Sequence, residues 1–171
     1  RVWEVATGRL DRVMRIAADR RLSHIRTRIV MHGPTLRVAI RAPDGSLRIH
    51  DLRSGEHVET VPVSDEPIDV LGDGASHPLA WSPDGRRLLA VSSRELVLWD
   101  GETTTVLFSP AGEYTAGAFD HDGQRIAAAS GGLVLIFDAT TGEQIAHRDH
   151  LPGPRTNLVF GADGTLLATG L

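Results

Sequence analysis

Histidine is the residue type in this chain that most directly suggests metal chemistry. The eight His residues are His24, His32, His50, His57, His77, His121, His147 and His150. Zinc sites of the protease type need two His and a Glu on one helix, and no such motif occurs. His147 and His150 are three residues apart on a segment that is expected to be strand and turn, where that spacing does not bring two rings together. We therefore expect no metal site.

The sequence also contains no ordered set of residues for nucleophilic catalysis. No Gly-x-Ser-x-Gly elbow occurs, and the Ser residues fall in expected turns. The chain has no Cys, which excludes thiolate nucleophiles and disulfides. It has no Lys, so a Gly-Lys-Ser/Thr phosphate loop cannot form. We expect no enzyme activity, no catalytic residue and no cofactor.

Carboxylates are concentrated in residues 64–76, which carry Asp65, Glu66, Asp69 and Asp73. A calcium ion takes 6–8 oxygen ligands, and four carboxylates in one loop could supply part of such a set. Their spacing matches no known calcium loop. A solvated acidic loop is the favoured interpretation.

Arginine is concentrated at the opposite end of the chain. Residues 1–53 carry 12 Arg and 5 acidic residues, and the remainder carries 6 Arg and 17 acidic residues. Such polarity can steer an acidic partner, or it can draw two parts of one molecule together. Base-stacking aromatics do not alternate with these Arg residues, and the isoelectric point is near 6.0. Nucleic-acid binding is not expected, and polyanion binding is the least favoured alternative.

Composition sets the broad class of the protein. The chain has 171 residues, 41% hydrophobic and 23% charged, as in a water-soluble globular protein. The longest apolar run, Leu133–Phe137, is far shorter than the ~18 residues of a membrane span. No targeting signal is visible, so we expect a cytoplasmic protein without a membrane partner. All 18 basic residues are Arg, which suggests a GC-rich bacterial source.

Strands and turns that could position any of these side chains recur along the whole chain. Four times an apolar strand ends in an aromatic residue or His followed by an acid, soon before a Gly. The four pairs are Trp3-Glu4, His50-Asp51, Trp99-Asp100 and Phe137-Asp138. Asp-Gly turns at 84, 122 and 163 are 38 and 41 residues apart. A strand-and-turn repeat of about 40 residues predicts stacked β-sheet blades.

The repeat divides the chain into blade units of four short antiparallel strands. Residues 77–110 form the clearest unit, residues 113–150 repeat it, and residues 23–63 match it in shape. Residues 1–22 supply the last two strands of a split blade, and residues 155–171 supply the first two. We therefore predict one all-β domain over 1–171, a β-propeller of about four blade-equivalents. Leu10–Arg21 also has helical apolar spacing, but the repeat predicts a strand at roughly Arg9–Ile16.

Three motifs carry a resemblance to a known family. Trp99-Asp100 at a strand end, the turn Ser82-Pro83-Asp84-Gly85 and the segment from Arg1 to Gly8 are similar to the WD-repeat family of β-propellers. The resemblance covers essentially the whole chain and implies aromatic rings buried between blades. These rings would be Trp3, Trp81, Trp99, Phe119, Phe137 and Phe160.

The resemblance also bears on blade number. Propellers of this family usually have seven blades, which implies that these residues are a fragment of a longer ring. Alternatively, the two half-blades pair with each other and close a four-bladed ring. An unclosed arc would expose strand edges and favour self-association.

The function that the resemblance implies is a non-catalytic scaffold that presents loops to a peptide or protein partner. Loop position alone makes Arg41, Asp44, Arg94 and Glu95 the candidate binding residues. The alternative is a propeller domain accessory to an enzyme, a hydrolase or kinase elsewhere in a longer chain. Trp81–Leu89 is also similar to strands of prolyl-oligopeptidase-like hydrolases and periplasmic translocation proteins.

Overall fold

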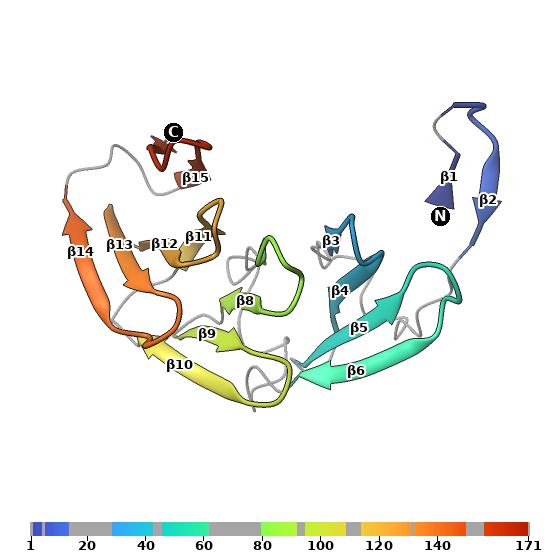
Figure 1. Ribbon diagram of the computed structural model, residues 1–171, viewed down its shortest axis with the longest axis horizontal. Helices are drawn as coiled ribbons and strands as arrows, with labels where there is room; N and C mark the ends of the chain where they lie inside the picture. Colours follow the sequence, from blue (N-terminus) through green and yellow to red (C-terminus); the bar gives the residue numbers. More distant parts are fainter. Residues whose placement is uncertain are drawn as a thin grey trace.

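The computed structural model describes residues 2–4, 6–13, 29–42, 46–61, 80–91, 95–108, 114–130, 132–149 and 156–170. These residues form β-strands and no helix (Figure 1). The prediction of an all-β chain is confirmed for the part that the structure describes.

The strands form five antiparallel sheets. Two are two-stranded: β1 (Val2–Trp3) with β2 (Leu10–Arg12), and β15 (Thr156–Phe160) with β16 (Leu166–Gly170). The β3–β6 sheet contains β3 (Ile29–His32), β4 (Arg37–Arg41), β5 (Leu47–Asp51) and β6 (His57–Val61). The β7–β10 sheet contains β7 (Ala80–Trp81), β8 (Leu88–Val91), β9 (Leu96–Trp99) and β10 (Thr104–Phe108). The β11–β14 sheet contains β11 (Tyr114–Phe119), β12 (Arg125–Ser130), β13 (Leu133–Asp138) and β14 (Gln144–Arg148).

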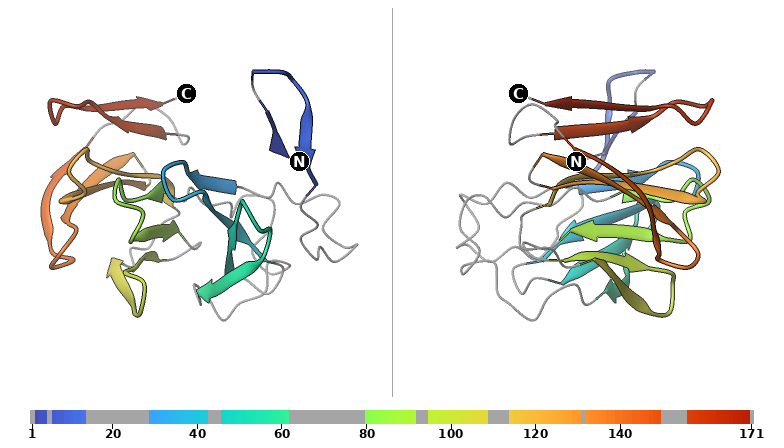
Figure 2. Two further views of the ribbon diagram at one scale, coloured as in Figure 1. Left: turned by 45° about the vertical axis from the view of Figure 1, so that its right-hand side comes forward. Right: turned by 90° about the vertical axis from the view of Figure 1, so that its left-hand side faces the viewer.

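The sheets follow one another along an open arc. Their fourth strands β6, β10 and β14 lie on its convex side in Figure 1. The β1–β2 pair and the β15–β16 pair stand at opposite ends, apart from each other in Figure 1 and in the left view of Figure 2. Among the described strands, none joins the two ends.

Three apolar clusters fill the spaces between successive sheets. On β8, Leu88 and Ala90 belong to the cluster shared with the β3–β6 sheet, whereas Leu89 belongs to the cluster shared with the β11–β14 sheet. The third cluster joins the β11–β14 sheet to the β15–β16 pair. Because successive residues of a strand point to opposite faces, a strand packed on both sides reads as a continuous apolar run, as in Leu96–Trp99.

The ring that ends the third strand of a sheet packs on the sheet before it. Trp99 is 4% exposed and shares its cluster with Ile49 of β5. Phe137 is fully buried and shares its cluster with Leu98 of β9. The first-strand rings Trp81 and Phe119 are buried in the same two clusters.

The expectation that Trp3 is buried is not met. Its side chain is 51% exposed, although it holds the same repeat position as Trp99 and Phe137. Those two rings are covered by the preceding sheet, and no described strand precedes β1. Phe160, the other ring near an end of the arc, is only partly buried against its cluster.

The ambiguous segment near the N-terminus contains a strand. Leu10–Arg12 form β2, which pairs with β1, so the strand predicted by the repeat is present over these residues. Residues 14–21 of the same window lie outside the described part of the chain.

Candidate interaction surface

Seven turns lie at one end of the stacked sheets. In an antiparallel meander the first and third connections are at the same end, and these are the connections that the structure describes most completely. We call this end the turn face; it consists of residues 33–36, 51–56, 82–86, 100–103, 120–124, 138–143 and 161–165. Backbone bonds join its neighbouring turns, such as Leu52 N–H to the Leu36 carbonyl (2.7 Å).

Two of the four candidate binding residues taken from the sequence are described by the structure, and both belong to the other end of the sheets. Arg41 is the last residue of β4, and Glu95 is a partly buried residue just before β9. Asp44 and Arg94 lie outside the described residues. The role of all four residues in binding therefore stays a prediction.

In three of the four repeated pairs the carboxylate of the acid caps the turn that follows it. Asp51 Oδ1 accepts hydrogen bonds from the backbone N–H groups of Arg53 (2.7 Å) and Ser54 (2.9 Å). These bonds, first that of Ser54 and then that of Arg53, hold the pKa of Asp51 below its usual value. Gly55 closes the turn at φ 77°, a conformation that favours glycine.

The acids of two further repeated pairs, Asp100 and Asp138, behave in the same way. Asp100 accepts from the backbone of Thr103 (2.7 Å) and Glu102 (3.0 Å), and Asp138 from Thr140 and Thr141 (both 2.8 Å). These bonds also lower the pKa of both carboxyls. The repeated acids thus hold turns in shape, and this role accounts for their recurrence without any catalytic function.

The turns between first and second strands are held by hydrogen bonds of their own polar side chains. In the β7–β8 turn, Ser82 Oγ donates to Asp84 (2.6 Å) and accepts from the Arg87 N–H (2.9 Å). In the β11–β12 turn the equivalent residue is Asp120, which is buried and binds the Nε of Arg125 (2.9 Å). Burial raises the pKa of Asp120, but the hydrogen bonds from Arg125 and Gln124 outweigh it and leave the pKa lowered.

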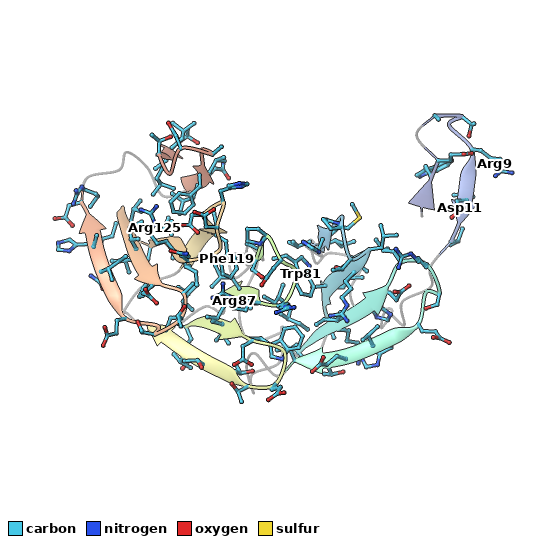
Figure 3. The ribbon with its side chains drawn as sticks, viewed as in Figure 1. Arg9, Asp11, Trp81, Arg87, Phe119 and Arg125 are labelled. Carbon is cyan, nitrogen blue, oxygen red and sulfur yellow. The ribbon has the colours of Figure 1, made fainter. Side chains whose placement is uncertain are left out.

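At the turn face, two side chains form hydrogen bonds from one sheet to the next. His32 Nε2 donates to the Pro83 carbonyl (3.0 Å), which can only accept, and Nδ1 is hydrogen-bonded to the Thr35 hydroxyl (2.7 Å). Arg87 donates from Nη1 to the Ala139 carbonyl (2.8 Å) and from Nη2 to the Gly123 carbonyl. Its guanidinium also lies 5.6 Å from the ring centre of Phe119 (Figure 3).

Sequence reasoning did not identify Arg87 or His32 as links between sheets. Arg87 was interpreted only as the start of a strand, and its partners are backbone carbonyls that leave no trace in the sequence. The available signal was the second Arg at the equivalent strand start, Arg125.

His50 is a buried polar residue that no described group satisfies. Its side chain is 8% exposed, and among the described residues neither ring nitrogen has a hydrogen-bond partner. The ring meets His57 edge-on, with centres 5.4 Å apart. Burial lowers the pKa of His50; the backbone of Gly55 opposes this, and the nearby charges of His57 and Arg48 reinforce it.

Replacing His50 with Phe should raise the free energy of unfolding at pH 7 by about 1–2 kcal/mol, because two unpaired nitrogens leave the interior while the ring stays. The folded-state pKa lies below the ordinary value of 6.5, so the unfolded chain binds more protons between the two values. Stability of the wild type should therefore fall as the pH drops through 6.5, and this part of the loss should vanish in His50→Phe. Urea unfolding at a series of pH values measures both effects.

The control for this substitution is His121→Phe, at an exposed turn position, which should change neither stability nor its pH dependence appreciably. Identical pH dependence of the wild type and His50→Phe between neutral and mildly acidic pH would contradict the assignment.

The described residues contain no group of three or more His, Asp or Glu side chains that could hold a metal ion. No helix in the same part of the chain is long and apolar enough to cross a membrane.

Comparison with known proteins adds no assignment: no protein-family model matches this chain, and no curated protein matches it significantly.

Proposed function

We propose that this chain is a non-catalytic scaffold of the WD-repeat type, a stack of propeller-like blades that holds a peptide or protein partner. The order of strands in the three four-stranded sheets supports this, since each is a meander from first to fourth strand. The packing of Trp99 and Phe137 on the preceding sheets supports it as well, because it is the packing that the repeat implies.

The turn face is the proposed contact surface. Its turns are capped by Asp side chains and fastened to each other by His32 and Arg87. A surface that is already ordered loses little conformational entropy on binding, which favours affinity. The hydrogen bonds of Arg87 are the observation that carries the proposal, because they join the β7–β8 turn to the β11–β12 and β13–β14 turns as one platform.

Within this platform the β7–β8 and β11–β12 turns expose a varied set of side chains. Pro83, Asp84, Arg86, His121 and Asp122 are all exposed. They combine an apolar ring, two carboxylates, a guanidinium and an imidazole, a set that suits a polar peptide segment rather than an apolar ligand. We expect the partner to contact these two turns together.

Selection from a random peptide library on the immobilised chain tests the proposal, with the affinity of the selected peptides measured by titration calorimetry. Arg86→Ala and His121→Ala should each weaken binding by about tenfold, the scale of a central interface residue. The matched control Arg148→Ala, an exposed Arg of β14 outside the turn face, should leave the affinity within about twofold.

Two outcomes would count against the proposal in different ways. Loss of affinity only in Arg41→Ala or Glu95→Ala would place the contact surface at the opposite end of the sheets. Failure to select any peptide that binds more tightly than about 1 mM would contradict a peptide-binding scaffold altogether.

A further inference from the structure

Two histidines lie opposite each other on neighbouring strands of the β3–β6 sheet. In the register of β5 and β6, His50 pairs with His57, and the two rings meet edge-on with their centres 5.4 Å apart. Directly opposite residues of an antiparallel pair have their side chains on one face of the sheet, close enough to interact. The sheet therefore brings two imidazoles together in its interior, away from either end of the chain.

The separation of the two rings suits a shared metal ion. Zinc binds His nitrogens at about 2.0–2.1 Å, so a zinc ion held by both rings lies about 3.2 Å from each ring centre. Ring centres 5.4 Å apart then give an angle of about 115° at the metal, close to the tetrahedral angle that zinc favours. The centres need not move for this, because turning a ring about its bond to Cβ leaves its centre in place.

His50 has the unbonded nitrogens that such a site needs. Its side chain is 8% exposed, and neither ring nitrogen has a hydrogen-bond partner among the described residues. Buried polar groups nearly always have a partner, so two unbonded nitrogens in the interior point to a bound water or ion. Turning this ring toward a metal also breaks no hydrogen bond.

His57 has the hydrogen bond that orients a metal-binding imidazole. Its Nε2 lies 2.9 Å from the Thr60 hydroxyl. Histidine ligands of metals usually donate their second N–H to such a partner, which fixes the tautomer and leaves the other nitrogen unprotonated. With Nε2–H donated to Thr60, Nδ1 is the nitrogen available to a metal. The side chain of His57 is exposed, so an ion reaches it from solvent.

We propose that His50 and His57 together bind a divalent transition-metal ion of the class that prefers imidazole, with Zn²⁺ as the probe and water in the remaining positions. Two protein ligands make a weaker site than the three or four of catalytic and structural zinc. Arg48 pairs with Thr60 in the same register, so a positive charge lies on the same face and lowers the affinity further.

A site of this strength suits reversible binding. The ion ties the outer strand β6 to β5, so the stability of this sheet depends on the concentration of free metal. The proposal rests on the geometry of the pair and does not depend on the peptide-binding function. It differs from the sequence-based expectation of no metal site, which used spacing along the chain and did not show that positions 50 and 57 are opposite each other.

Titration calorimetry of the metal-free chain with Zn²⁺ tests the site. Half the ligand set of a structural zinc site corresponds to a dissociation constant of about 1–100 μM, with one ion per chain. His50→Phe, which keeps a buried ring, and His57→Gln should each raise the dissociation constant by about tenfold or more. The matched control His121→Gln, at an exposed turn position, should leave it within about twofold.

Unfolding with and without Zn²⁺ gives a second readout that a purely structural role of either ring would not produce. Saturating Zn²⁺ should raise the urea midpoint of the wild type and leave that of His50→Phe unchanged. Thr60→Val, which removes the partner of Nε2 and keeps the shape of the side chain, should weaken binding by about tenfold.

Three outcomes would overturn the proposal. The first is no binding of Zn²⁺ to the wild type at about 1 mM. The second is binding that persists in His50→Phe and is lost in His57→Gln, which would mean that one exposed ring holds the ion alone. The third is binding that persists in both variants, which would place the ion on other residues. Unchanged affinity in Thr60→Val would contradict the orientation assigned to His57.

Discussion

Replacing Trp99 with Ala should lower the free energy of unfolding by about 3–5 kcal/mol, the usual cost of deleting a buried aromatic ring. The side chain is 4% exposed and lies in the cluster between the β3–β6 and β7–β10 sheets. Its ring meets Trp81 edge-on, with centres 6.4 Å apart, so the substitution also removes an aromatic contact.

Trp3→Ala is the matched control, because residue type and repeat position are the same and only burial differs. With half of its side chain exposed, Trp3 should contribute less than about 1 kcal/mol to the free energy of unfolding. Urea unfolding of the two variants and the wild type gives both values. Equal losses in the two variants would contradict the packing described for the third-strand rings.

Arg87→Met should lower the free energy of unfolding by about 2–3 kcal/mol. Met retains an unbranched side chain at this position. The substitution removes two charged hydrogen bonds to carbonyls of the next sheet and the contact of the guanidinium with Phe119. Hydrogen bonds to charged groups contribute about 1.5–3 kcal/mol, and the Gly123 and Ala139 carbonyls would lose a partner. Chemical unfolding of the variant measures the loss.

Two further variants show whether the geometry of Arg87 matters. Arg86→Met, at the exposed neighbouring position, should change stability by less than about 0.5 kcal/mol. Arg87→Lys should recover only part of the loss, because one ammonium group cannot span two carbonyls as the planar guanidinium does. Full recovery in Arg87→Lys would mean that charge alone, and not the link between two turns, is responsible.

Local pattern was sufficient to predict the strands and turns. The sequence predicts a strand over Glu95–Trp99, and the structure has one over Leu96–Trp99. The Asp-Gly turns at 84 and 122 place Gly85 and Gly123 at positive φ, as the turn chemistry requires. Strand periodicity and turn residues act over a few positions, so one sequence is enough to recognise them.

Burial of the repeated ring was not predictable from the ring itself. Trp3 and Trp99 have the same residue type and the same repeat position, and an acid follows each of them, yet one is exposed and the other buried. The difference comes from whether another sheet packs on that face. This is a property of the neighbouring unit and not of the motif.

The link made by Arg87 was hidden for a related reason. Its acceptors lie 36 and 52 residues away and are backbone carbonyls, which every residue possesses. Arg125, at the equivalent position, binds Asp120 of its own turn. The turn of Arg87 has Ser82 in place of that Asp, and the guanidinium of Arg125 lies beside Gly164 of the next sheet just as that of Arg87 lies beside Gly123.

Packing of each third-strand ring on the preceding sheet is tested most directly by a double-mutant cycle between Ile49 and Trp99. Both residues belong to one buried cluster but come from different sheets. Unfolding of Ile49→Ala, Trp99→Ala and the double variant should give a coupling energy of about 0.5–3 kcal/mol. Ile49→Ala combined with Phe137→Ala, which removes a ring of the next cluster, should be additive to within about 0.5 kcal/mol. Additivity of Ile49 with Trp99, together with coupling of Ile49 to Phe137, would contradict the stacking order of the sheets.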